Sequence, residues 1–141
     1  MSLERIADLA GRERYLAVVS TTRPDGDVST SVVNAGILPH PVDGTPVLGL
    51  VSMPGAARLR NLRHHPRATL TFRAGWEWVS VTGAAEVVDW SSDDPEAMRR
   101  LLRAIYHAAG GEHSDLEEYD RTMAAEGRVA VLIRPERFSP R

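Results

Sequence analysis

Apolar residues recur at two different spacings along this chain, and the spacings divide it into strands and helices. Alternating or short continuous apolar runs predict six strands, at residues 15–21, 28–34, 47–52, 68–73, 76–88 and 128–134. Recurrence every three to four residues predicts helices at residues 2–11, 56–64, 95–109 and 114–127. Gly11 is expected to end the first helix, and Ser114 with Glu117 is expected to form a capping box that opens the last one.

Most of the predicted strands are joined by short turns. Residues 23–27 (Arg-Pro-Asp-Gly-Asp) and residues 74–75 (Ala-Gly) supply the Pro and Gly that reverse a chain, whereas the proline-rich residues 39–46 are expected to form a loop. Six such strands predict a mainly β fold, a closed antiparallel barrel with flanking helices, and the alternative is an open α+β sheet. Regular alternation of strand and helix is absent, as is a Gly-rich phosphate loop, so a Rossmann or P-loop domain is not expected.

Length and composition narrow the chemistry further. A chain of 141 residues predicts a single domain, residues 1–141. It has no Cys, which excludes disulfides and thiolate chemistry, and all 17 of its basic residues are Arg, which excludes Schiff bases on lysine. We find no signal peptide and no apolar run long enough to span a membrane, so we expect a cytoplasmic protein without a membrane partner.

Charge is distributed unevenly, although the formal net charge is only −2. No acidic residue lies between Asp43 and Glu77, a stretch that contains five Arg and two adjacent His, whereas acidic residues dominate from Glu86 to Glu126. The basic stretch is expected to attract anions, and the alternative is a set of solvated Arg side chains. The acidic second half argues against a nucleic-acid partner.

The basic helix has features of an anion site. A strand that ends at Ser52 leads through a Pro-Gly turn into the first turn of this helix, where free N–H groups and the helix dipole favour an anion. Arg58 and Arg60 can add charged hydrogen bonds, and Ser52 can donate its hydroxyl. The alternative is a helix decorated with solvated Arg.

Few other residues indicate chemistry. Trp76 and Trp78 are two apart on a predicted strand, so both indoles should face one side, as a wall for a planar ring, as part of a dimer interface or as ordinary core. The five His lack metal-ligand spacing and no G-x-S-x-G elbow occurs, so we expect no metal site and identify no catalytic residue. Together with the basic helix, the Trp pair favours a planar cofactor that carries phosphate.

Four segments, in this order, resemble a known family. They are residues 23–26 (RPDG), 58–70 (RLRNLRHHPRATL), 79–87 (VSVTGAAEV) and 129–137 (VAVLIRPER). This pattern resembles the pyridoxamine 5′-phosphate oxidase-like split-barrel flavin and deazaflavin oxidoreductases, and within them the branch that uses coenzyme F-420.

The resemblance implies a six-stranded split β-barrel that forms a homodimer with two cofactor sites at the subunit interface. It also implies where the cofactor binds. The phosphate would lie at the start of the basic helix, the backbone of the second strand would line the ring, and the Trp pair would lie near the partner subunit. The cofactor-binding residues implied are Ser31, Val32, Val33, Asn34, Ser52, Arg58, Arg60, Asn61, Trp76 and Trp78.

The function expected from this resemblance is hydride transfer from a reduced deazaflavin to an electron-poor small-molecule acceptor, such as an enone, imine or quinone. Arg58 stands where family members often have Lys, which leaves the choice between coenzyme F-420 and FMN open. An FMN-dependent reductase or oxidase and a non-catalytic cofactor-binding protein are the alternatives. Because the chain ends at Arg141, we do not expect the activity of a pyridoxamine phosphate oxidase itself.

Overall fold

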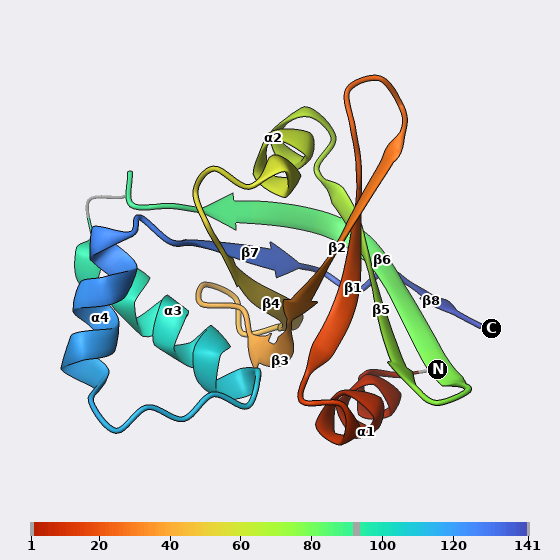
Figure 1. Cartoon of the computed structure of the whole chain (residues 1–141), viewed down its shortest axis with the longest axis horizontal. Helices are drawn as coiled ribbons and strands as arrows, with labels where there is room; N and C mark the ends of the chain where they lie inside the picture. Colours follow the sequence, from red (N-terminus) through yellow and green to blue (C-terminus); the bar gives the residue numbers. More distant parts are fainter. Residues whose placement is uncertain (1, 92–93, 141) are drawn as a thin grey trace.

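The computed structural model describes residues 2–91 and 94–140. Within these residues, strands and helices follow one another in an order that places two long helices between the sixth and seventh strands (Figure 1). The elements are α1 (Leu3–Arg12), β1 (Leu16–Thr22), β2 (Val28–Asn34), β3 (Gly36–Pro39), β4 (Pro46–Ser52), α2 (Ala57–His64), β5 (Arg67–Ala74), β6 (Glu77–Val88), α3 (Pro95–Ala108), α4 (Leu116–Ala125), β7 (Val129–Ile133) and β8 (Arg137–Ser139).

All strand pairs are antiparallel, and the strands form one path in the order β2-β1-β5-β6-β7-β4-β3. The long strand β6 connects the two halves, because its first part pairs with β5 and β8 and its last four residues pair with β7. β2 and β3 are the two ends of the path. The sheet therefore curls into a barrel that stays open between β2 and the β3–β4 hairpin, so a split barrel is correct and a fully closed one is not.

Burial on both faces explains the continuous apolar sequence of β7. Val129, Val131 and Ile133 face the barrel interior, where they join Phe72, whereas Ala130 and Leu132 face α3 and α4. The described residues thus form two hydrophobic cores separated by the β4–β7 layer, one inside the barrel and one between that layer and helices α3 and α4.

Side-chain caps begin three of the helices. Ser2 Oγ accepts the Arg5 N–H at 3.4 Å at the start of α1, and Asp94 accepts the Ala97 N–H at 3.0 Å at the start of α3. In α4 the N-cap is Asp115 and not the predicted Ser114, so the helix begins one residue later. An aspartate is as good a cap as a serine, and the sequence pattern does not distinguish the two registers.

The end of α3 packs directly on β3. A Cβ on Gly36 would lie 2.3 Å from the carbonyl carbon and oxygen of Ala108, so only glycine permits this approach. The contact fixes the position of α3 over the open side of the barrel, where the candidate site lies.

Several predictions from the sequence need correction. The described residues form eight strands where six were predicted, because residues 36–38 of the short edge strand β3 were assigned to no element and the three-residue β8 has no apolar pattern. Pro39 is tolerated in β3 because it ends an edge strand. Gly11 does not end α1, which continues to Arg12. Among the described residues, no helix is long and apolar enough to cross a membrane.

Candidate functional site

Arg58 is the centre of the candidate site. It lies in the first turn of α2, which follows β4 after a short turn, and its side chain reaches back to two strands. Nη1 donates to Ser52 Oγ at the end of β4 and Nη2 donates to Ser31 Oγ on β2, both at 2.9 Å. The guanidinium therefore joins α2, β4 and β2 where the barrel is open.

The charge of Arg58 is not balanced by a carboxylate. Among the described residues it has no ion pair, and its Nε is buried without a hydrogen-bond partner. Burial lowers the pKa of the guanidinium, since the charged form loses solvation. The first turn of α2 contains no acidic residue and its N-cap, Ala56, provides no side-chain acceptor. A half-buried cation with an unused N–H at an uncapped helix start fits an anionic group, such as a phosphate.

A cavity of about 380 Å³ opens beside this guanidinium. One side is formed by β2 and the end of β4, and the other side by α3 and α4. Its lining residues are Val32, Val33, Asn34, Val51, Met53, Arg58, Ile105, Tyr106, Ala109, Tyr119, Met123 and Arg128. Among these residues are two arginines and no carboxylate, so the cavity combines an apolar wall with positive charge.

Two tyrosines form the aromatic part of this wall. The rings of Tyr106 and Tyr119 lie 4.7 Å apart between centroids, with an interplanar angle of 32°. Their hydroxyls donate to backbone carbonyls, Tyr106 to Glu112 at 3.0 Å and Tyr119 to Leu102 at 3.2 Å. Burial raises the pKa of Tyr119 to about 12. Both hydroxyls are thus bonded to backbone carbonyls, and the ring faces offer apolar surface.

The structure brings together the predicted residues of β2 with the start of the basic helix. Val32, Val33 and Asn34 line the cavity, while Ser31 and Ser52 hold Arg58. The Asn34 side chain is already engaged, because its Nδ2 donates to the Arg14 carbonyl at 2.9 Å. That contact secures the tight turn before β1, in which Arg14 adopts a positive φ of 56°.

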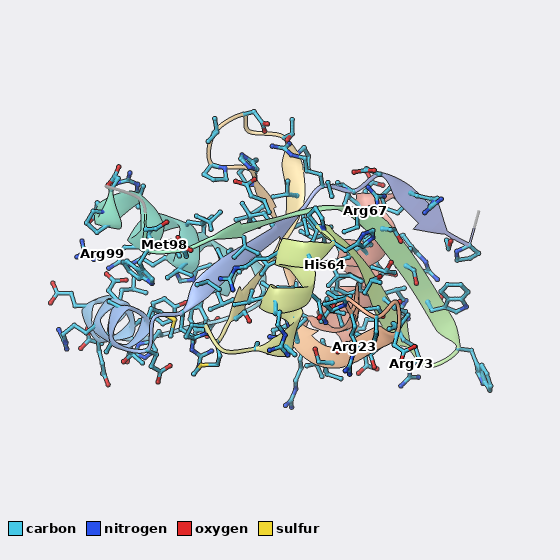
Figure 2. The ribbon with its side chains drawn as sticks, turned by 90° about the horizontal axis from the view of Figure 1, so that it is seen from above. Arg23, His64, Arg67, Arg73, Met98 and Arg99 are labelled. Carbon is cyan, nitrogen blue, oxygen red and sulfur yellow. The ribbon has the colours of Figure 1, made fainter. Side chains whose placement is uncertain are left out.

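Arg60 and Asn61 do not join this cluster. Asn61 is 2 % exposed and donates from Nδ2 to Thr21 Oγ1 at 3.0 Å, which fastens α2 to β1 inside the protein. Arg60 is exposed and, together with Arg23 and Asn61, lines a separate small pocket. Figure 2 shows Arg23 at the barrel end of the molecule, away from Met98 and Arg99 of α3. The structure therefore gives Asn61 a packing role, and the prediction that it binds phosphate stays untested.

Trp76 and Trp78 also lie away from the cavity within one chain. Trp76 belongs to the β5–β6 turn and not to the strand, and it is 99 % exposed. Trp78 is on β6 and is 44 % exposed. Their hairpin projects at the opposite end of the molecule from α4 (Figure 1). The expectation that both indoles face one side of a strand is wrong for Trp76, and their position near a partner subunit stays a prediction.

Sequence reasoning named no individual site residue on the α3–α4 side of the cavity. Tyr106 lies in the predicted helix at residues 95–109, and Tyr119, Met123 and Arg128 were assigned no role in a site, yet all four line the cavity. A half-buried residue beside a cavity has the same helical spacing as a core residue, so periodicity does not separate the two cases. Gly127, whose φ is 62°, follows the end of α4, but a glycine at a helix end does not by itself indicate a cavity.

His40 is the most buried histidine, and its environment is structural. Its Nε2 lies 3.0 Å from Glu86 Oε1 and its Nδ1 accepts the Val42 N–H at 3.1 Å. These bonds hold the β3–β4 turn against β6. In the part of the chain that the structure describes, no three His, Cys, Asp or Glu side chains are grouped as metal ligands.

Comparison with known proteins identifies the fold and the family. The sequence model of the family described as pyridoxamine 5′-phosphate oxidase matches residues 4–140. A conserved hypothetical protein of Mycobacterium tuberculosis is similar, with a TM-score of 0.71 and 24 % identity over 98 % of this chain and 82 % of that one. An F-420 reductase gives a TM-score of 0.64 and 20 % identity over 95 % of both chains.

A third solved structure is similar at lower identity. A pyridoxamine 5′-phosphate oxidase-related, FMN-binding protein of Nostoc punctiforme gives a TM-score of 0.68 and 12 % identity, over 96 % of this chain and 81 % of that one. At these identities the structures show a shared fold, and the family match over residues 4–140 shows the membership. The chain belongs to the pyridoxamine 5′-phosphate oxidase family of split-barrel proteins.

Proposed function

We propose that this protein is an oxidoreductase that binds coenzyme F-420 and reduces an electron-poor small molecule. The observation that carries the proposal is Arg58, a half-buried cation with no carboxylate partner among the described residues and a buried, unpaired Nε, placed at the edge of a cavity with an apolar wall. A planar redox cofactor with an anionic side chain has two parts that complement these features: the anion fits Arg58, and the flat ring fits the apolar wall. The similarity to an F-420 reductase supports the choice of cofactor.

The residues of the site would bind and orient, and none of them is expected to react. Arg58 would bind the phosphate, with Ser31 and Ser52 fixing the plane of the guanidinium. Val32 and Val33 would lie against the ring and exclude water. When bound, a reduced deazaflavin supplies a hydride, and the expected acceptors are enones, imines or quinones. Because both tyrosine hydroxyls of the cavity are bonded to carbonyls, the proton would come from solvent.

A homodimer is part of this proposal. The outer face of β1 and β2 exposes Leu16, Val18, Val28 and Val32, and β2 is an unpaired edge of the sheet. Exposed valines on an edge strand favour association with another chain. Val32 lines the cavity and also belongs to this face, so a second copy placed here would complete the cavity wall.

Cofactor binding is the first test. We expect fluorescence titration of the purified protein to show binding of F-420, and replacement of Arg58 by Gln to weaken it by at least about tenfold, the effect of losing a charged hydrogen-bond donor. Arg63→Gln is the matched control, because it removes the same charge from an exposed position of the same helix. Unchanged affinity in Arg58→Gln would remove the basis of the proposal.

FMN is the alternative cofactor, since its phosphate fits the same guanidinium. Titration with FMN in parallel distinguishes the two, and oxidation of reduced F-420 by a quinone such as menadione tests turnover. Tight binding without turnover over varied acceptors would favour a non-catalytic cofactor-binding protein. For the dimer, we expect sedimentation to show two chains and Val18→Glu to give a monomer, because a carboxylate would be buried in the interface.

A further inference from the structure

The cavity contains a second cation, Arg128, on the side opposite β2. It lies between the end of α4 and the start of β7, and its neighbour Val129 pairs with Ser52, the residue that Arg58 contacts. The two arginines therefore approach the cavity from adjacent ends of β4 and β7. No lining residue is acidic, and Arg128 adds a second positive charge to that of Arg58 in the lining of this cavity.

The backbone of Arg128 is fixed on both sides. Its N–H donates to the Met123 carbonyl at 3.0 Å, which closes the end of α4, and its carbonyl accepts the Trp90 Nε1–H at 2.8 Å. A side chain on a fixed backbone loses less conformational freedom when it binds a ligand. Arg128 is thus better prepared for recognition than an arginine on a mobile loop.

The side chain of Arg128 is held by a weak partner. Its Nε donates to Glu126 Oε1 at 2.9 Å, and this is the one ion pair of Arg128 among the described residues. The two side chains are 30 % and 42 % exposed, and exposed pairs of this kind contribute little to stability. The pair uses one of the five N–H groups of the guanidinium, so an anion from the cavity can bind the others or displace Glu126.

The surroundings of Arg128 specify the rest of the ligand. Met123, Tyr119 and Tyr106 line the same side of the cavity, and the tyrosine hydroxyls are already bonded to carbonyls. These side chains offer ring faces and a thioether, which suit a flat conjugated group. The chemical class that fits is a planar molecule with a carboxylate, sulfonate or phosphate at its edge.

We propose that Arg128 is a second anion-binding residue of this cavity and that Glu126 competes with the ligand for it. The inference rests on the proposed function in using the same cavity, and it adds a chemical requirement: a ligand bound there carries an acidic group beyond the one at Arg58. That group belongs either to the side chain of the cofactor or to the acceptor.

The test uses 8-anilinonaphthalene-1-sulfonate, a flat anionic dye, with protein that contains no cofactor. We expect Arg128→Gln to weaken dye binding about tenfold, as for loss of one charge-assisted hydrogen bond. Glu126→Gln is expected to tighten it about threefold, because the competing carboxylate is gone. In the double variant Glu126→Gln should have no further effect, since its action passes through Arg128.

The controls separate charge from packing. Arg121→Gln removes an exposed arginine of α4 that does not line the cavity, and it should leave dye affinity unchanged. N-phenyl-1-naphthylamine, the uncharged counterpart of the dye, should bind all variants equally. Equal dye affinity in wild type and Arg128→Gln, or tightening by Glu126→Gln that persists without Arg128, would overturn the proposal.

Titration of the same variants with F-420 and FMN identifies the source of the acidic group. If Arg128→Gln weakens cofactor binding, the group belongs to the cofactor. If it weakens only the dye in protein saturated with cofactor, the group belongs to the acceptor. The dye measurement needs no cofactor, so its failure is distinct from a failure of Arg58→Gln to affect cofactor binding.

Discussion

Replacing Arg58 by Met is expected to leave the stability of the protein unchanged or to raise it. Loss of a half-buried, hydrogen-bonded arginine ordinarily destabilises a protein. Here the guanidinium has no counter-charge among the described residues, and its Nε is buried without a partner. Met has an unbranched side chain that fills much of the same space without a charge.

The magnitude follows from the contacts that are lost and gained. Two hydrogen bonds from the charged guanidinium to hydroxyls disappear, at about 1.5 kcal/mol each. Ser52 keeps its bond to the Met53 carbonyl and Ser31 is partly exposed to water, so neither hydroxyl is left unsatisfied. The buried Nε–H, which belongs to a charged group, no longer costs about 3 kcal/mol. The net change in the free energy of unfolding is therefore expected within about 1 kcal/mol of zero.

Urea unfolding without phosphate measures the stability of Arg58→Met, and urea unfolding with phosphate measures whether the variant still binds the anion. An anion that binds only the folded wild type stabilises it by about 2.7 kcal/mol at one hundred times its dissociation constant. Arg58→Met should lose that response, while Arg63→Met, at an exposed site of α2, should keep it and report the general effect of salt. A loss of more than about 2 kcal/mol in phosphate-free buffer, or a retained response to phosphate, would refute the reasoning.

Three further predictions concern the scaffold. Gly83→Ala should destabilise the protein by about 3 kcal/mol or more in thermal unfolding, because its Cβ would lie 1.6 Å from the Arg134 carbonyl oxygen, whereas Gly11→Ala, with open space around it, should be neutral or stabilising. Asn61→Ala should cost about 2 kcal/mol in urea by leaving a buried threonine hydroxyl unpaired, and F-420 affinity should be retained if the role of Asn61 is structural. Hydrogen bonds from Thr45, and then from Arg134, lower the pKa of Asp43 from its ordinary value of 3.8. The ionised carboxylate therefore stabilises the protein above pH 3.8, and this stabilisation is lost as pH falls through the lower pKa of the folded state. Asp43→Asn should be less stable than wild type at neutral pH, and the stabilities of variant and wild type should converge in acid.

Strands β1, β4, β5, β6 and β7 were predictable because each has a buried face or is buried on both. β7 shows this, since its five residues are all buried and a continuous apolar run is the expected result. The anion site was predictable in part, because Ser52 and Arg58 are close in sequence on a strand–turn–helix unit. The bond from Arg58 to Ser31 was not, since it joins residues 27 positions apart and depends on how β2 lies beside β4.

Three residues of the basic helix were predicted to bind phosphate, and the structure places their side chains in three different environments. Arg58, Arg60 and Asn61 were all candidates for the phosphate site, yet successive helix positions point about 100° apart. Arg58 points to the open side of the barrel, Asn61 into the core and Arg60 to solvent. Choosing among them requires knowing which side of α2 faces the barrel opening, and that is a property of the tertiary fold.

The incomplete closure of the barrel explains why the site lies where it does. Had β2 paired with β3, the sheet would have closed and side chains would have filled the space that the cavity occupies. Among residues 2–91 and 94–140, the open path leaves β2 with a free edge, Arg58 half-buried without a counter-charge, and Val32 exposed beside the cavity. Each of these three features is unfavourable in an isolated chain. An anionic planar ligand would compensate the charge of Arg58, and a second chain over β2 would cover both its free edge and Val32. Cofactor binding and dimerisation should therefore be thermodynamically coupled: F-420 should shift the monomer–dimer equilibrium toward the dimer in sedimentation, and the shift should be lost in Arg58→Gln.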